Sequence, residues 1–258
     1  MQNLQNEIAI MAEIRSPYVV ALKDATKTAN NFYLAMELCN GGDLANLCTV
    51  RGGYLRENEA RVLLCQIVKG IGAIKDKHVM HRDLKLPNIM LHFSLLPPNA
   101  CVDPSFDLKK YLNATPITAS SVICKITDLG FARKLLEDQL AETACGTPLQ
   151  MAPEVLSGQL YNHKADVWSL GCLFYEMLTG FTPFTGRNQR NLQENIAKGT
   201  YMFPKTLKLS LEGLSFLNQC LQYEHDKRLD WTDMLNHSYI QDADRPQASD
   251  SELFLSYC

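Results

Sequence analysis

Apolar residues recur every three or four positions across residues 60–74, which is the clearest periodic pattern in the chain. This spacing places them on one face of an α-helix, so the sequence predicts an amphipathic helix of four turns. The residues on that face are Ala60, Leu63, Leu64, Ile67, Val68, Ile71 and Ile74.

The N-terminal stretch predicts a shorter helix followed by two strands. Residues 1–14 carry Leu4, Ile8 and Met11 on one helical face. Pro17 predicts the end of that helix, because proline interrupts helical hydrogen bonding. The apolar runs 19–22 and 32–36 predict two strands joined by the polar stretch 23–31.

The second half of the chain is predicted to be mostly helical from residue 155 onward. Residues 167–178 are apolar on nearly all faces, which indicates a buried central helix. Further helices are predicted at 188–198, 210–222 and 231–236. Residues 241–258 are polar and acidic before a Leu-Phe-Leu triplet, and we interpret them as a tail.

Residues 92–121 break the periodic pattern, since prolines and polar residues mix there without a clear period. We expect a surface insertion with a helical turn near 106–112, followed by a short strand at 122–126. Two interpretations of residues 92–121 remain. The favoured one is a solvated insertion, and the alternative is a docking surface for a regulatory partner.

Composition limits the classes of function. The chain has 258 residues, 46% of them apolar, and a net charge of −3, which argues against a general attraction to nucleic acid or anionic membranes. Its nine cysteines are scattered and form no C-x-x-C pairs, which favours a reducing, cytoplasmic setting over a disulfide framework or a zinc site. Residues 1–7 lack the features of a signal peptide, and no apolar run predicts a transmembrane segment.

The candidate chemistry is concentrated in residues 81–88, which begin His81-Arg82-Asp83. Asp83 can accept a hydroxyl proton, Lys85 can hold a transferring phosphate, and the amide oxygen of Asn88 can bind Mg²⁺. Phosphoryl transfer requires an acid, a cation and a metal ligand close together.

Three further motifs follow in order. Asp128-Leu129-Gly130 comes directly after the predicted strand 122–126, where an aspartate can point into a cleft and hold a metal. Ala152-Pro153-Glu154 comes next, and then the run 166–171, which reads Asp-Val-Trp-Ser-Leu-Gly. Each motif is weak alone, but four in this order and spacing are a strong signal.

With these four motifs the chain resembles the eukaryotic protein kinases over residues 1–240. Lys85 and the triplet Gly146-Thr147-Pro148 resemble the serine/threonine branch rather than the tyrosine branch. Residues 142–156 look most like the Unc-51-like, autophagy-initiating kinases.

The resemblance implies an α+β, protein-kinase-like fold. Residues 1–38 would form a partial, β-rich N-terminal lobe with one helix and two strands. Residues 39–240 would form a mostly helical C-terminal lobe that contains the insertion 92–121, and residues 241–258 would be a polar tail. The nucleotide cleft would lie between the lobes.

The resemblance also implies catalytic roles, with ATP and Mg²⁺ as cofactors and protein substrates as partners. Asp83 would orient and deprotonate the substrate hydroxyl, and Lys85 would steady the γ-phosphate. Asn88 and Asp128 would hold the Mg²⁺ ions that neutralise the phosphates. Thr147 would belong to the substrate-docking region.

Five residues would form the nucleotide site by resemblance. The backbone of Glu37 and Cys39 would bind adenine, with Met36 as gatekeeper. Asp43 would lie near the ribose and Met90 under the ring. None of these assignments follows from periodicity or spacing.

Regulation would centre on Thr143, which lies in the segment that resembles an activation loop. A phosphate there adds close to two negative charges. By resemblance, Arg82 and Arg133 would clamp that phosphate and order the loop. Glu7 matches the helix glutamate that pairs with a lysine in active kinases.

Other matched residues are expected to be structural. Glu154 would pair with Arg228, and Asp166 would hydrogen-bond the backbone of the catalytic loop. By resemblance, His81 would be a packing residue in a hydrophobic spine with Leu22, Met11 and Leu129 rather than a base.

The sequence contains neither a Gly-rich loop nor a Lys-bearing V-A-I-K strand ahead of Glu7. Two interpretations compete. The favoured one is an N-terminally truncated piece of a longer active kinase, because Asp83, Lys85, Asn88 and Asp128 are all present. The alternative is a catalytically inactive, pseudokinase-like interaction module.

Overall fold

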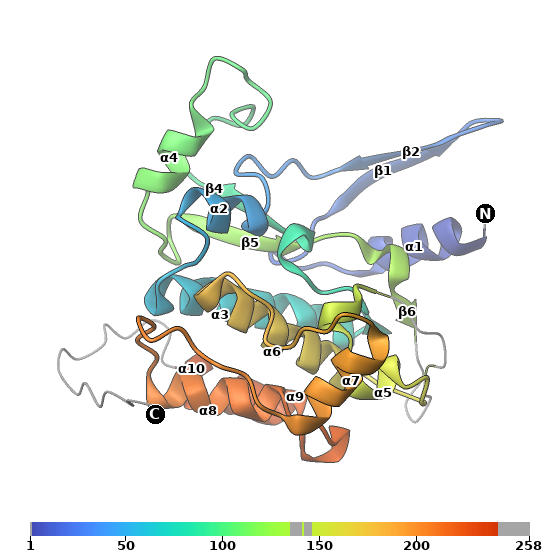
Figure 1. The fold of residues 1–258 in the computed structure, drawn as a ribbon. Helices are drawn as coiled ribbons and strands as arrows, with labels where there is room; N and C mark the ends of the chain where they lie inside the picture. The colour runs from blue at the N-terminus through green and yellow to red at the C-terminus, as the bar shows by residue number, and fades with distance from the viewer. Residues whose placement is uncertain (1, 135–140, 142–145, 242–258) are drawn as a thin grey trace.

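The computed structural model describes residues 2–134, 141 and 146–241, leaving out the side chains of residues 2–7, 131 and 133. Figure 1 shows a small N-terminal part, formed by α1, β1 and β2, above a larger and mostly helical part. The predicted α+β, kinase-like fold class is therefore confirmed. None of the helices in these described ranges is long and apolar enough to cross a membrane.

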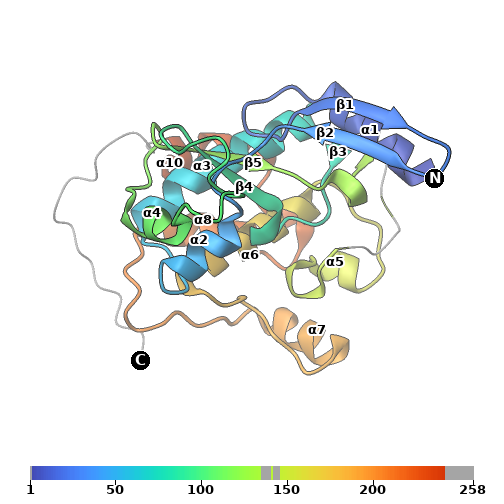
Figure 2. The ribbon, with the colours of Figure 1, turned by 90° about the horizontal axis from the view of Figure 1, so that it is seen from above.

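The N-terminal part consists of one helix and one hairpin. α1 (Gln2–Glu13) confirms the predicted helix, and its C-terminal half buries Ile10 and Met11. β1 (Leu22–Lys27) pairs antiparallel with β2 (Phe32–Met36), and Figures 1 and 2 show the hairpin extending alongside α1. β2 confirms the prediction at 32–36.

The predicted strand at 19–22 is wrong, because β1 begins at Leu22 and runs through residues predicted to be a linker. Val19 and Val20 are buried, and the backbone N–H of Val20 donates to the carbonyl of Ile126 at 2.9 Å. Burial of these residues against the larger part explains their apolar character. The exposed residues of β1 are polar, so the sequence pattern did not reveal the strand.

Two long helices form the centre of the larger part. α3 (Glu57–Lys75) confirms the predicted amphipathic helix and starts with a capping box in which Glu59 accepts from the backbone N–H of Arg56 at 3.3 Å. α6 (Lys164–Thr179) is buried nearly all round, as predicted, and ends at Gly180, whose φ of 76° suits glycine. These helices contribute much of the hydrophobic core.

Shorter helices surround this centre. They are α2 (Leu44–Val50), α5 (Pro153–Leu156), α7 (Gln189–Lys198), α8 (Leu211–Cys220), α9 (Trp231–Asn236) and α10 (Ser238–Gln241). α7, α8 and α9 match the predicted helices. Asp43 caps α2, since its Oδ1 accepts from the N–H of Asn46 at 2.8 Å.

Two small antiparallel sheets frame the candidate catalytic segments. β3 (Val79–Met80) pairs with β6 (Arg133–Lys134), and β4 (Ile89–Phe93) pairs with β5 (Val122–Ile126). The loop 81–88 runs between β3 and β4, and residues 127–132 run between β5 and β6. The sheets therefore bring Asp83 and Asp128, forty-five positions apart, to one end of the molecule.

The insertion is more ordered than a solvated loop. His92 and Phe93 belong to β4, so the insertion starts after residue 93, and α4 (Leu108–Ala114) supplies the predicted helical turn. Four apolar side chains of the insertion are buried: Leu96, Ala100, Leu112 and Ile117. The buried amide of Asn40 donates to the carbonyls of Phe93 and Leu96 at 3.1 and 2.9 Å. These contacts attach the insertion to α2 and β4.

Replacing Arg51 with Ala is expected to destabilise the protein by about 2–3 kcal/mol and to loosen the insertion. Arg51 donates through Nε to the carbonyl of Leu112 at 2.8 Å and through a second nitrogen to the carbonyl of Thr115. It also pairs with the buried Glu59 at 3.0 Å. Urea unfolding and limited proteolysis within 92–121 measure both effects.

The matched control is Arg190→Ala, which removes an exposed ion pair with Glu194 at 3.0 Å. Such a pair is worth about 0.5 kcal/mol or less. Equal losses in the two variants would show that Arg51 does not anchor the insertion.

Candidate active site

The backbone of the loop 81–88 is fixed by a buried carboxylate from α6. Asp166 accepts from the N–H of His81 at 2.9 Å through Oδ2 and from the N–H of Arg82 at 2.8 Å through Oδ1. Arg82 has a φ of 70°, a conformation that non-glycine residues adopt rarely. The two hydrogen bonds stabilise this conformation and present the next residue, Asp83, to the cleft.

The side chain of Asp83 lies at the centre of a polar cluster. It is buried, and its Oδ2 accepts from Lys85 Nζ at 2.6 Å and from Asn88 Nδ2 at 3.2 Å. Its Oδ1 accepts from the hydroxyl of Thr147 at 3.0 Å, and Lys85 Nζ lies 3.2 Å from the same hydroxyl. Three donors thus hold the carboxylate in one orientation.

His81 lies in the core behind this cluster. It has no exposed surface, and its Nε2 is 3.0 Å from the carbonyl of Thr127. Its Nδ1 accepts from the N–H of Asp83 at 3.3 Å. Both ring nitrogens therefore contact the backbone, and the ring connects the loop 81–88 to the residue before Asp128. Of the other predicted spine residues, Leu129 and Met11 are buried and Leu22 is partly buried.

Asn88 and Asp128 lie near each other through the pairing of β4 with β5. Ile89 pairs with Ile126, and the N–H of Thr127 donates to the carbonyl of Asn88 at 3.0 Å. Asn88 uses Nδ2 to donate to the carbonyl of Asp83 at 2.8 Å. Among the described residues, no group donates to its Oδ1, so this oxygen is available to a ligand.

The donor set of Asn88 and Asp128 fits Mg²⁺. Asp128 is exposed, with φ 62° and ψ 71°, and its one described hydrogen bond is from the N–H of Gly130 at 3.3 Å. Magnesium is held in proteins by one or two carboxylates together with waters and substrate phosphates. One carboxylate and one amide oxygen match that pattern, although the described residues hold no group of three His, Cys, Asp or Glu suited to a metal ion.

Three of the predicted nucleotide residues, Glu37, Cys39 and Asp43, lie on the segment that joins β2 to α2, whereas Met36 ends β2 and Met90 lies in β4. Cys39 is buried, and burial raises the pKa of its thiol to about 11. Asp43 forms an isolated bridge with Met90. Met36 is 47% exposed, because β2 pairs only with β1 within the described residues.

A partly buried ion pair at this segment was not predicted. Lys125 in β5 pairs with Glu37 at 3.0 Å and donates to the carbonyl of Pro17 at 2.7 Å. Burial alone raises the pKa of the Glu37 carboxyl, but the hydrogen bonds from Lys125 and the N–H of Ala21, with the charges of Lys125 and Lys23, together lower it by more. A lysine within the apolar run 122–126 was the available sequence signal. The pair attaches the segment to the larger part.

Several predicted regulatory groups lie outside the described residues. These are Thr143 and the side chains of Glu7 and Arg133. Arg82 is described, and its guanidinium lies 3.3 Å from the hydroxyl of Tyr161. Gln150 is buried and donates to Glu176 at 3.0 Å.

The ion pair expected between Glu154 and Arg228 is present. Arg228 contacts the two carboxylate oxygens of Glu154 at 2.7 and 3.0 Å, and both side chains are buried. Arg228 also donates to the carbonyl of Lys164 at the start of α6 at 2.7 Å. The pair therefore joins α5 to α6 at some distance in sequence from Asp83.

Comparison with known families agrees with this geometry. The family described as "Protein kinase domain" matches residues 1–240. The chain belongs to the protein kinase family. The match includes the loop 81–88, Asp128 and the Glu154–Arg228 pair, so it covers every described part of the candidate site.

Relatives within this kinase family include serine/threonine-protein kinase ATG1c of Arabidopsis thaliana, which is 34% identical over 98% of this chain and 32% of its own length. Human serine/threonine-protein kinase ULK1 is 36% identical over 92% of this chain and 21% of its own length. Calcium-dependent protein kinase 5 of Plasmodium berghei is 31% identical over 93% of this chain and 38% of its own length.

The predicted likeness to Unc-51-like kinases is confirmed by the ATG1 and ULK1 relatives. The chain spans about a third of the length of the first of these relatives. All three relatives are named as protein kinases, and the comparisons give no support to the interaction-module alternative.

Replacing Gly146 with Ala in this kinase domain is expected to cost about 2–3 kcal/mol of stability. Gly146 has a φ of 105°, and an added Cβ would lie 2.4 Å from the carbonyl oxygen of Arg82. Left-handed strain accounts for about 1–2 kcal/mol, and the clash with the backbone adds to it. Thermal unfolding measures the loss.

Gly158→Ala is the matched control, because Gly158 has a φ of 65° but nothing within 4 Å of the added Cβ. It should show the strain alone, about 1–2 kcal/mol. If Gly146→Ala loses no more stability than this control, the contact between Gly146 and the catalytic loop is not tight.

Proposed function

We propose that this protein kinase domain transfers the γ-phosphate of ATP to serine or threonine hydroxyls of protein substrates. The observation that carries the proposal is the environment of Asp83. Its carboxylate is held by Lys85, Asn88 and Thr147, and all three groups donate to it. A carboxylate fixed in this way can receive a hydroxyl proton at one position in the cleft.

In the proposed reaction the substrate hydroxyl oxygen forms a bond to the γ-phosphorus, and the bond from that phosphorus to the β-bridging oxygen breaks. The hydroxyl proton moves to a carboxylate oxygen of Asp83, and ADP leaves. Lys85 lies 2.6 Å from Asp83, so its positive charge is next to the oxygen that receives the phosphate. That charge stabilises the negative charge that shifts during transfer.

Asn88 Oδ1 and the carboxylate of Asp128 would hold Mg²⁺, which neutralises the phosphate oxygens when it is bound. Asp128 has an αL backbone, its carboxylate accepts from the N–H of Gly130 at 3.3 Å, and the next residue, Leu129, is buried. Asn88 is oriented by its donation to the carbonyl of Asp83. The residues that position the metal are therefore coupled to the residue that accepts the proton.

For the nucleotide we propose backbone contacts from Glu37 and Cys39, with Met90 beneath the adenine and Asp43 near the ribose. One oxygen of Asp43 caps α2, which fixes the direction of the carboxylate. Met36 would be the gatekeeper. Thr147, through its contacts with Asp83 and Lys85, would connect substrate docking to the catalytic carboxylate.

Regulation and setting are further parts of the proposal. Phosphorylation of Thr143 would be recognised by Arg82 and Arg133, and Glu7 would pair with a lysine. A role in autophagy is inferred from the likeness to the ATG1 and ULK1 kinases. The seven described cysteines are free thiols, which fits a reducing compartment, and we propose the cytoplasm. Leu95 and Val102, 88% and 71% exposed on the insertion, are candidates for contact with a regulatory partner.

The complete protein, incubated with Mg²⁺ and radiolabelled ATP, is expected to label itself or an added protein substrate on serine and threonine. Asp128→Ala should reduce the rate by about 100-fold or more, because losing a metal ligand removes several kcal/mol of charge stabilisation. Asp226→Ala, which removes an exposed carboxylate near α9, should leave the rate unchanged. Absence of labelling by the unmodified protein, or labelling that Asp128→Ala does not affect, would contradict the proposal.

A further inference from the structure

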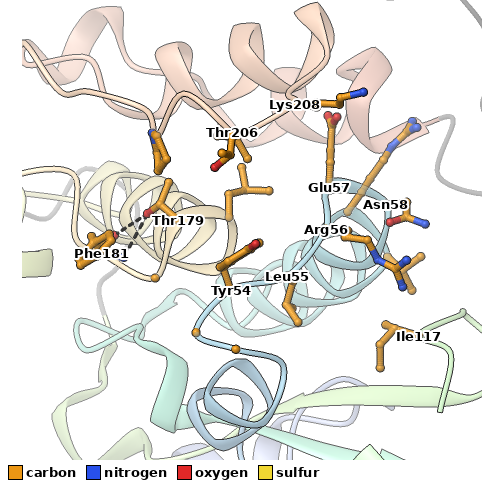
Figure 3. Close-up of a pocket in the computed structure, with 18 of the residues that line it drawn as sticks. Tyr54, Leu55, Arg56, Glu57, Asn58, Ile117, Thr179, Phe181, Thr206 and Lys208 are labelled. Carbon is orange, nitrogen blue, oxygen red and sulfur yellow. Dashed lines mark hydrogen bonds between the residues drawn. The ribbon is translucent and has the colours of Figure 1, made fainter. Parts of the chain in front are cut away.

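A large hollow lies on the helical part, and none of its lining residues belongs to the loop 81–88 or to residues 127–132. Its volume is about 1120 Å³. The N-terminal end of α3, the segment 52–56 before it, the C-terminal end of α6 and the segment 204–208 surround it. Figure 3 shows Thr179 and Phe181 on one side and Arg56, Glu57 and Lys208 on the other.

The wall of the hollow exposes large apolar side chains. Tyr54 is 52% exposed and Phe181 is 70% exposed, whereas aromatic residues of their size are usually more deeply covered. Further apolar lining comes from Leu55, Val62, Ile117, Leu178, Pro204 and Leu207. Apolar surface gathered in a concave site favours an occupant with large apolar side chains.

The charges around the hollow are mainly positive. Arg56, Arg61 and Lys208 line it, together with the single carboxylate of Glu57, and Arg56 pairs with Glu59 outside the lining at 3.2 Å. Glu57 accepts from the N–H and the hydroxyl of Ser210, so its charge is partly offset locally. Arg61 donates to the carbonyls of Ser238 and Tyr239, which are uncharged acceptors. The site therefore favours an acidic occupant.

The described chain ends beside this hollow. Arg61 Nε lies 2.7 Å from the carbonyl of Tyr239, so the last helix, α10, contacts a residue that lines it. A second hollow of about 560 Å³ shares Val62 and Ala119 with the first and is lined by Ile240 and Gln241. The chain beyond Gln241 therefore starts at the edge of a continuous concave surface.

Residues 242–258, which lie outside the described residues, have the chemistry that this surface favours. They contain four carboxylates, Asp242, Asp244, Asp250 and Glu252, against one cation, Arg245. The apolar triplet Leu253-Phe254-Leu255 follows directly after Glu252. An extended chain covers up to about 3.3–3.6 Å per residue, so the twelve residues from Gln241 to Leu253 reach at most about 40 Å.

We propose that residues 242–258 of this chain dock into the hollow between α3 and α6, with Leu253, Phe254 and Leu255 against the exposed Tyr54, Phe181 and Pro204. The acidic residues before the triplet lie near Arg61 and Lys208. Docking connects the N-terminal end of α3 with the C-terminal end of α6. This inference does not depend on the proposed phosphoryl transfer.

Photo-crosslinking of the full chain tests the proposal. With benzoylphenylalanine in place of Phe254, irradiation should link residue 254 to the segments 54–62, 178–181 or 204–208, as identified by mass spectrometry. An equal mixture of unlabelled and ¹⁵N-labelled protein should give cross-linked peptides of one isotope only. Mixed-isotope peptides would identify a second copy as the occupant, and cross-links elsewhere or none at all would likewise overturn the proposal.

Two sets of variants separate docking from general proximity. Lys208→Glu should lower the cross-linking yield about three- to fivefold, as expected for loss and reversal of one exposed charge pair. Lys198→Glu, a charge reversal at the end of α7 and outside both hollows, should not change the yield. Leu253→Asp with Leu255→Asp alters only the segment beyond the described fold and should also abolish the cross-link. Unchanged yield in that double variant would overturn the proposed apolar contact.

Discussion

The variant Asp83→Asn is expected to lose about 10²- to 10⁴-fold in the rate of phosphate transfer while keeping its fold. An amide cannot accept the hydroxyl proton, and general bases contribute about this factor in enzymes. Steady-state transfer from radiolabelled ATP by the complete protein measures the rate. Thermal unfolding of the same sample shows whether the fold is retained.

The expectation that the fold survives follows from the hydrogen bonds of Asp83. Lys85 and Asn88 both donate to Oδ2, and an asparagine can place its carbonyl oxygen there. The amide nitrogen of the new asparagine would then face the hydroxyl of Thr147. In the unmodified protein that hydroxyl donates to Oδ1 of Asp83 at 3.0 Å. A hydroxyl can accept as well as donate, so all three contacts persist after the hydroxyl rotates. A loss of activity in Asp83→Asn would therefore come from the missing proton acceptor and not from a change in the fold.

Asp103→Asn provides the control, since Asp103 is half-buried on the insertion and its side chain hydrogen-bonds only to Ser105 among the described residues. Its rate should stay within about twofold of the unmodified protein, as is typical of surface substitutions away from the site. A rate for Asp83→Asn close to that of the control would rule out Asp83 as the base. If the melting temperature of Asp83→Asn falls together with its rate, the loss of rate reflects structural damage instead.

The helical part of the fold was predictable because its periodicity is strong. Residues 60–74 carry one unbroken apolar face, and α3 follows it. The hairpin was harder, since β1 exposes the polar residues of its sequence and buries almost nothing. β3 and β6 are each two residues long, which is too short for an alternation of apolar and polar residues to be recognised in the sequence. Tertiary contacts, rather than local pattern, determine those strands.

The catalytic loop was recognisable from its residue types and order, but its internal contacts were not. No sequence rule indicates that Thr147, sixty-four positions after Asp83, donates to the same carboxylate as Lys85. The pairing of Lys125 with Glu37 also depends on the folded chain, because it brings β5 under the segment after β2. Long-range polar contacts of this kind are specified only when the helices and sheets have packed.

Replacing Arg228 with Ala is expected to destabilise the protein by about 3–5 kcal/mol, the largest structural effect among these variants. The side chain of Arg228 has no exposed surface, and Glu154 is 5% exposed. Removing the guanidinium leaves a carboxylate buried without a countercharge, and it also removes a donor from the carbonyls of Lys164 and Gln222. The guanidinium additionally lies 5.2 Å from the ring centroid of Trp168.

A double-mutant cycle in urea separates the ion pair from these other contacts. The variant Glu154→Leu with Arg228→Met removes both charges and should be less destabilised than Arg228→Ala, because no buried charge remains unpaired. Lys227→Ala, which removes a neighbouring exposed pair with Glu224 at 2.7 Å, should change stability by less than about 1 kcal/mol. If the double variant is as unstable as the sum of Glu154→Leu and Arg228→Met, the two side chains act independently. The contacts of Arg228 with Lys164, Gln222 and Trp168 would then account for its stabilising effect.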